Sequence, residues 1–201
     1  LQSTLDLSDS ELKKVVMRFP GLLGFSVEDK LEPKLDWLQD RLNLDAAQLK
    51  KMVLNLPPLL GLSVEDNMAL KLEWLRTRLD LDDAQLKKMV LRLPPLLGMS
   101  IADNLAPTLD WLQKRLDLDD LGLRKMVLRL PSVLSTSIDI LESKLDWLQT
   151  RLDLDDAGLR KVVVAFPPLL GLSVENNMEP KLGFWEEELG LSPSEVRASI
   201  L

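Results

Sequence analysis

The sequence repeats itself five times with an almost constant period, and this feature constrains the fold most. A proline closes a similar apolar run in each repeat, as in LNLPPLLGLS and LRLPPLLGMS. These prolines are Pro20, Pro57, Pro94, Pro131 and Pro167, at intervals of 37, 37, 37 and 36 residues. A fixed period of about 20–50 residues is typical of a solenoid, in which each repeat buries its apolar face only against its neighbours. We therefore expect a working surface built from equivalent positions in successive repeats.

The composition narrows the class of protein. The 201 residues are 46% hydrophobic and 28% charged, and no apolar run approaches the roughly 20 residues needed to cross a bilayer. The sequence contains no histidine, cysteine or tyrosine, which excludes disulfides and thiolate metal sites. It also contains none of the common nucleophile or phosphate-loop motifs. We predict a non-enzymatic protein with no cofactor, no metal, no small-molecule substrate and no membrane span.

The third repeat shows how the first half of each repeat is expected to fold. Asp82 and Gln85 have the spacing of a capping box, and apolar residues recur from Leu86 at i, i+3, i+4 and i+7. This spacing predicts a helix over residues 82–92, which ends at Pro94 because proline cannot continue it. The same capping-box spacing occurs at Ser8–Glu11, Asp45–Gln48 and Ser192–Glu195.

The second half of each repeat begins with a Leu-Leu-Gly run, which predicts one turn of 3₁₀ helix ending at Gly98 in the third repeat. Ser100 is then expected to cap a second helix over residues 100–115. Proline lies inside this helix in three repeats and should bend it. These prolines are Pro33, Pro107 and Pro180. The fourth repeat has one residue fewer between Ser137 and Trp147, so we expect a local distortion early in its second helix.

Two helices and a short turn in each repeat predict an all-α fold. We expect a curved solenoid, or superhelix, of about five helix–helix–3₁₀ repeats of 36–37 residues, with residues 1–201 forming a single array. The repeats are placed near 8–44, 45–81, 82–118, 119–154 and 155–191, with a partial sixth at 192–201. Because both ends fall inside a repeat, we expect a fragment of a longer protein.

An aromatic–basic pair recurs in each of the first four second helices. The pairs are Trp37–Arg41, Trp74–Arg78, Trp111–Arg115 and Trp147–Arg151, and the fifth repeat has Phe184 and Glu188 instead. One interpretation is a ladder of aromatic side chains that stack on bases. The other is that tryptophan packs between repeats while arginine lies against its ring, which suits a large flat residue at every repeat boundary.

The charges are distributed unevenly, although the net charge is −7. Acidic residues gather in the turns before the first helix of each repeat, where capping and the helix dipole explain them without a catalytic role for a pair such as Asp82–Asp83. The outer positions of the first helices are basic. The candidate nucleic-acid-binding residues are Lys13, Lys14, Arg18, Lys50, Lys51, Lys87, Lys88, Arg92, Arg124, Lys125, Arg129, Arg160 and Lys161. Stacked repeats would align them into columns that either track phosphates or form an ordinary solvated face.

The residues of each repeat resemble the mitochondrial transcription termination factor (mTERF) repeat. The resemblance rests on LKKMVLRLP at 86–94, SVEDN at 63–67, NMEPKLGF at 177–184 and ELGLS at 188–192. It implies a left-handed superhelix of helical triplets, each with two α-helices and one 3₁₀ helix. It also implies a nucleic-acid-binding role in transcription termination, transcription regulation or RNA processing in a mitochondrion or chloroplast. The expected partner is the phosphate backbone of double-stranded DNA or RNA.

An alternative function is a protein-interaction scaffold within a larger organellar assembly. An apolar column on the first helices would suit that use, or would pack against the next repeat. The column consists of Met17, Leu54, Leu91, Leu128 and Val164. The uniformity of the repeats is also what a consensus-style design would show, and it limits base readout because successive repeats offer the same side chains.

Overall fold

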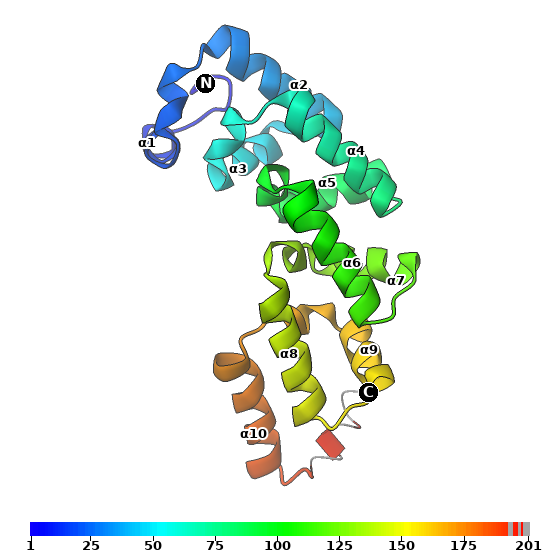
Figure 1. The fold of residues 1–201 in the computed structure, drawn as a ribbon. Helices are drawn as coiled ribbons and strands as arrows, with labels where there is room; N and C mark the ends of the chain where they lie inside the picture. The colour runs from blue at the N-terminus through cyan, green and yellow to red at the C-terminus, as the bar shows by residue number, and fades with distance from the viewer. Residues whose placement is uncertain (193–194, 197, 199–201) are drawn as a thin grey trace. The chain divides into compact units, whose positions relative to one another are not determined.

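A computed structural model describes residues 1–192, 195–196 and 198 of the chain (Figure 1). All regular structure within these residues is helical, which confirms the all-α expectation. The contacts divide the chain into two compact units, Leu1–Ile101 and Ala102–Leu201. No helix among the described residues has the length and apolar character of a membrane span.

The same order of elements recurs along both units. The first unit contains α1 (Asp9–Arg18), η1 (Pro20–Gly24), η2 (Val27–Leu31), α2 (Glu32–Leu42), α3 (Ala46–Asn55), η3 (Pro57–Gly61), η4 (Val64–Ala69), α4 (Leu70–Arg78), α5 (Asp83–Arg92) and η5 (Pro94–Gly98). After η6 (Ile101–Leu105), the second contains α6 (Ala106–Arg115), α7 (Asp120–Arg129), η7 (Pro131–Ser135), α8 (Ile138–Arg151), α9 (Asp156–Ala165), η8 (Pro167–Gly171), η9 (Val174–Met178) and α10 (Glu179–Glu187). The first helices are therefore the odd-numbered α-helices, and the second helices are the even-numbered ones.

The first helices begin and end as the sequence predicts. In α1, α3 and α5 the N-cap side chain accepts a hydrogen bond from the N3 backbone, and the N3 side chain accepts one from the N-cap backbone. Such a cap stabilises a helix by about 1 kcal/mol. The same reciprocal bonds join Ser192 and Glu195. Residues 193–194, 197 and 199–201 of the expected partial sixth repeat lie outside the described part of the chain.

The second helices depart from the sequence prediction. In four repeats a π-helical segment precedes the α-helical segment, namely η2, η4, η6 and η9. The fourth repeat instead has one regular α-helix, α8, of 14 residues. The expected distortion in the fourth repeat is therefore wrong, because the distortion lies in the second helices of the other repeats.

The number of residues explains where the π segments form. Ser100 lies 11 residues before Trp111, whereas Ser137 lies 10 residues before Trp147. A π segment absorbs one extra residue within an α-helix. Proline is not its cause, because the second repeat has Leu70 at the proline position and still forms η4.

The prolines of the second helices begin the α-helical segments and do not interrupt them. They lie in the first turn of α2, α6 and α10, directly after a π segment. The helical run is continuous across this point, because the backbone N–H groups of Glu32 and Glu179 bond back to Val27 and Val174 in the π segments. Proline therefore lies inside a continuous helical run, as the sequence predicts, but the part of that run before the proline is π-helical and not α-helical.

The predicted apolar faces form the core of the repeats. In α5, Leu86, Met89 and Val90 are buried, and Leu93 at the end of the helix is only 8% exposed. The second helices contribute a matching buried stripe. In the third repeat this stripe consists of Leu105, Leu109, Leu112 and Leu116, with Ile101 half-buried.

A residue in the left-handed conformation follows each of the first four second helices. These residues are Asn43, Asp80, Asp117 and Asp153, with φ between 45° and 48°, and Asp6 adopts the same conformation before α1. Short polar side chains tolerate this conformation, and it ends helices because it redirects the chain. Several acidic residues that the sequence places near the first helices therefore serve as turn residues, and their carbonyl groups become acceptors for the basic side chains described next.

Candidate nucleic-acid interface

The candidate basic residues fall into three positions on the first helices, and the three positions differ in their exposure and in the contacts that their side chains make. The second residue of each basic pair is exposed in every repeat. We call these five residues the outer lysines: Lys14, Lys51, Lys88, Lys125 and Lys161. None of their side chains has a hydrogen bond or ion pair with another residue in the described part of the chain. Their positive charges are therefore available to an external partner.

In three repeats the first residue of the basic pair reaches the turn before the preceding first helix. Lys50 Nζ donates to the carbonyl of Asp6 at 2.5 Å and pairs with Glu11 Oε2 at 2.9 Å. Lys87 Nζ donates to the carbonyl of Asn43.

The equivalent residues of the other repeats complete this position. Arg160 Nη1 pairs with Asp117 Oδ2 at 2.7 Å and also donates to the Asp117 carbonyl. Lys13 is exposed and Arg124 is half-buried. The first position is therefore largely engaged in contacts between neighbouring repeats.

The third position is occupied by Arg18, Arg92 and Arg129, all of which are exposed. Arg18 Nη1 donates to the carbonyl of Leu54 at 3.3 Å. Arg129 Nη1 donates to the carbonyl of Ala165 at 2.9 Å. Both acceptors lie in the last turn of the next first helix, where free carbonyls and the helix dipole favour a positive charge. Arg18 and Arg129 therefore stabilise the end of the neighbouring helix.

The pairing of Lys50 with Glu11 changes the electrostatics of the first position. The hydrogen bond from Lys50, together with that from the Ser8 backbone, lowers the pKa of Glu11 to about 2. The charge of Lys50 is thus partly neutralised by an ionised carboxylate. The outer lysines have no such partner among the described residues, so the two adjacent positions differ in the charge that they present to solvent.

A further set of lysines, on the second helices, was not predicted from the sequence. Lys34, Lys71 and Lys144 each donate to the carbonyl of the last leucine in the next 3₁₀ turn, which is Leu60, Leu97 and Leu170 respectively. Lys71 is only 3% exposed, and burial lowers its pKa. The signal in the sequence is the recurrence of lysine at this position, which Thr108 replaces in the third repeat. We call Lys34, Lys50, Lys71, Lys87 and Lys144 the seam lysines. Three of them, on the second helices, donate to the 3₁₀ turn of the next repeat, and Lys50 and Lys87 donate to the turn that precedes the previous first helix.

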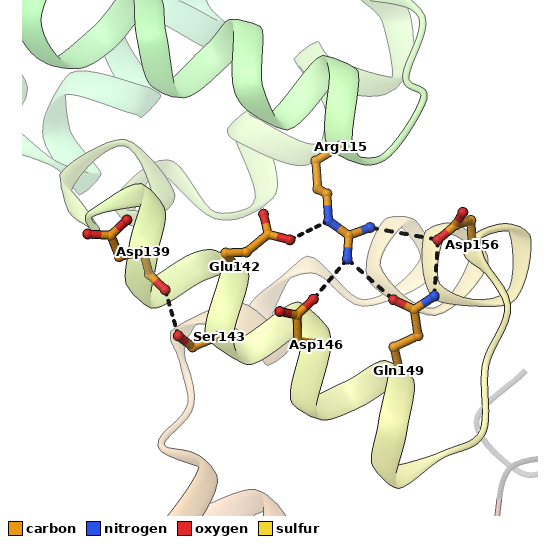
Figure 2. Close-up of polar contacts among 7 residues, drawn as sticks. All are labelled: Arg115, Asp139, Glu142, Ser143, Asp146, Gln149 and Asp156. Carbon is orange, nitrogen blue, oxygen red and sulfur yellow. Dashed lines mark hydrogen bonds and ion pairs between the residues drawn. The ribbon is translucent and has the colours of Figure 1, made fainter.

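The arginines of the Trp–Arg pairs also contact the next repeat. Figure 2 shows Arg115 surrounded by side chains of α8 and α9. Its Nε pairs with Glu142 at 2.7 Å and its Nη2 pairs with Asp146 at 3.2 Å. Arg151 pairs in the same way with Glu179 and Glu186, and the hydrogen bond from Arg151 lowers the pKa of Glu186. The arginines thus link successive second helices, while each tryptophan of the pairs is half-buried.

The apolar column on the first helices is mostly covered. Met17 is 71% exposed, but Leu54, Leu91, Leu128 and Val164 are half-buried. The column therefore offers a fully exposed side chain in only one described repeat. A separate, open groove of about 790 Å³ lies between α7 and α9, and the basic residues Arg160 and Lys161 line it together with Gly122.

The exposed basic side chains of the first helices could contact an anionic surface. No group of acidic residues in the described structure could hold a metal ion. What recurs is an exposed ammonium group on each first helix, held by a helix that is capped at its start and packed through its apolar face. A rigid helix that presents a free cation is a typical arrangement for contacts with phosphates.

Comparison with protein families identifies the class of this protein. The mTERF family model matches residues 2–119, more than half of the chain, so the chain belongs to the mTERF family. This confirms the resemblance drawn from the repeat sequence. A search of curated proteins gave no match.

Proposed function

We propose that this chain is a non-enzymatic nucleic-acid-binding protein of organellar gene expression, which acts in transcription regulation or RNA processing in mitochondria or chloroplasts. Membership of the mTERF family supports this class of function. The observation that carries the assignment of the surface is the exposure of all five outer lysines, without a partner among the described residues.

The outer lysines suit the phosphate backbone of a double-stranded nucleic acid. In this proposal the repeats form a left-handed solenoid, and the outer lysines follow one another along it at intervals of 36–37 residues. Contacts with phosphates position a duplex but carry no sequence information. Because every repeat offers the same side chain, we expect binding with little discrimination between base sequences.

The net charge of −7 does not by itself exclude this proposal, because the charges are unevenly distributed. Glu11 and Asp117 pair with basic residues of the first position, and Glu142 and Asp146 pair with Arg115 on the second helices. The charge that a partner meets depends on the local distribution more than on the sum.

The test is a gel-shift comparison of two variants with the same change in net charge. One variant carries Lys51→Gln, Lys88→Gln and Lys125→Gln; the other carries Lys30→Gln, Arg76→Gln and Lys114→Gln, which are exposed residues outside the first helices. We expect the affinity of the first variant for duplex DNA or RNA at low salt to fall about tenfold or more, because each of its three substitutions removes a phosphate contact. The matched variant should lose much less.

Two results would contradict the proposal. If the two variants weaken binding equally, the outer lysines do not form the binding surface. If the unmodified chain binds heparin as tightly as either duplex, the interaction is a general attraction for polyanions and the proposed partner is wrong.

A further inference from the structure

One exposed position of the first helices changes from repeat to repeat, whereas the outer lysine is present in all five. This position follows the outer lysine by four residues, so the two side chains lie on the same face of the helix. We call it the variable position. From the first repeat to the fifth it holds Arg18, Asn55, Arg92, Arg129 and Ala165, all of them exposed. A preference for particular bases has to come from such a position, because identical side chains offer the same contacts at every base step.

Two of the arginines at the variable position already use a donor within the protein. Arg18 Nη1 donates to the carbonyl of Leu54 at 3.3 Å, and Arg129 Nη1 donates to the carbonyl of Ala165 at 2.9 Å. Ala165 itself offers no polar group from its side chain. These repeats therefore either hold their charged group at a neighbouring helix end or have none at this position.

Asn55, the last residue of α3, is the one amide at the variable position. Its side chain is exposed and has no hydrogen bond to another described residue. An amide both donates and accepts, whereas lysine and arginine only donate. Lys51 lies one turn before it on the same face, and its ammonium group is also without a partner among the described residues. The second repeat thus presents a free cation and a free amide side by side.

We propose that Asn55 reads an adenine in the major groove of double-stranded DNA while Lys51 contacts a phosphate beside it. This inference rests on the function proposed above and narrows its partner. Adenine offers the acceptor N7 and the donor N6 in the major groove, and the amide of asparagine matches both. The major groove of duplex RNA is too narrow for side chains to read, so the matching partner is DNA. Since the other outer lysines contact only phosphates, we expect one preferred base pair for each bound chain.

Selection of bound duplexes from a library of random DNA sequences by the full chain tests the proposal. We expect one A·T pair to be enriched. In the selected duplex, replacing that pair by G·C should weaken binding about fivefold or more, as the loss of a bidentate base contact does. Replacing only its adenine by 7-deazaadenine, which still pairs with thymine but lacks the N7 acceptor, should also weaken binding. A duplex RNA of the same sequence should show no such preference.

Three variants then assign the preference to a residue. Asn55→Ala and Asn55→Asp should both lose the preference for the A·T pair, because the first has no polar group and the second has no amide donor. Both should still bind duplex DNA through the outer lysines. The matched control is Asn176→Ala, which removes an exposed asparagine of η9 outside the first helices and should keep the preference. Circular dichroism checks the fold of each variant.

The outcomes separate this inference from the function on which it rests. Salt-dependent binding of duplex DNA with no preferred A·T pair overturns the reading of adenine and leaves the phosphate-binding role in place. A preference that Asn55→Ala retains in full, or that appears equally in duplex RNA, also overturns it. If the unmodified chain binds no duplex at low salt, the proposed function itself is wrong and this inference falls with it.

Discussion

The seam lysines and the outer lysines are the same residue type, and in two repeats a seam lysine directly precedes an outer lysine in the sequence, yet they do different things. Lys87 is half-buried and donates to the carbonyl of Asn43, whereas Lys88 is exposed and has no partner among the described residues. The difference arises because successive residues of a helix point about 100° apart, so only one of the pair faces the neighbouring repeat. A basic run in a repeat protein therefore has to be divided by what each side chain faces before any of it is assigned to a partner.

The largest effect on stability is expected from the most buried seam lysine. Lys71→Met keeps the apolar part of the side chain but leaves the carbonyl of Leu97 and the amide of Asn67 without their donor. A buried acceptor that loses its partner costs about 1–3 kcal/mol. We expect the free energy of unfolding in urea to fall by about 2 kcal/mol. An unchanged midpoint would mean that desolvation of the lysine offsets its hydrogen bonds, and that the seam contact contributes nothing to stability.

The adjacent pair Lys87 and Lys88 gives the sharpest matched comparison. Lys87→Met should lower the free energy of unfolding by about 1 kcal/mol, because it removes a charged donor from a backbone carbonyl. Lys88→Met should change stability by less than about 0.5 kcal/mol, as exposed substitutions usually do. For affinity to duplex DNA the order should be reversed. Thermal unfolding measures the loss of stability in the two variants, and gel-shift titration measures their loss of DNA affinity. If the same variant shows the larger loss in both assays, the seam lysines and the outer lysines do not have separate roles.

A smaller effect concerns the ionisation of Glu11. Its pKa of about 2 is lowered from 4.5 mainly by Lys50, so Lys50→Met should raise it, whereas Lys51→Met should leave it in place. A carboxyl group with a lowered pKa in the folded state contributes stability above its unfolded pKa, and this contribution is lost as the pH falls from about 4.5 towards 2. Titration of the Glu11 side chain by NMR measures the shift. An ordinary pKa in the unmodified chain would show that the Lys50–Glu11 pair does not form in solution.

The local features of the fold followed from the sequence. Caps such as Asp82 with Gln85, the apolar face of α5 and the turn that ends at Gly98 all depend on residues within one helix or turn, where spacing determines the outcome. The same spacing gave the wrong location for the helix distortion. The 10-residue interval from Ser137 to Trp147 is that of a regular helix, and the other repeats carry one extra residue, so the predicted distortion falls in the wrong repeat.

The division of the basic residues could not be predicted from one repeat. Lys71 and its acceptor Leu97 lie 26 residues apart, and Lys87 and Asn43 lie 44 residues apart, in different repeats. Helical periodicity shows that both lysines of a pair avoid the core of their own repeat. It does not show that the first of them meets a left-handed turn whose carbonyl faces outward, as at Asn43.

The salt dependence of duplex-DNA binding tests the role of the outer lysines most directly. It is measured for the unmodified chain and for a variant in which all five outer lysines are replaced by glutamine. The logarithm of the binding constant should fall linearly with the logarithm of the salt concentration, with a slope of about −0.9 for each phosphate contacted. We expect the slope to become shallower by about one for each outer lysine that contacts a phosphate. Equal slopes for the two proteins would contradict the account, because the outer lysines would then contact no phosphate.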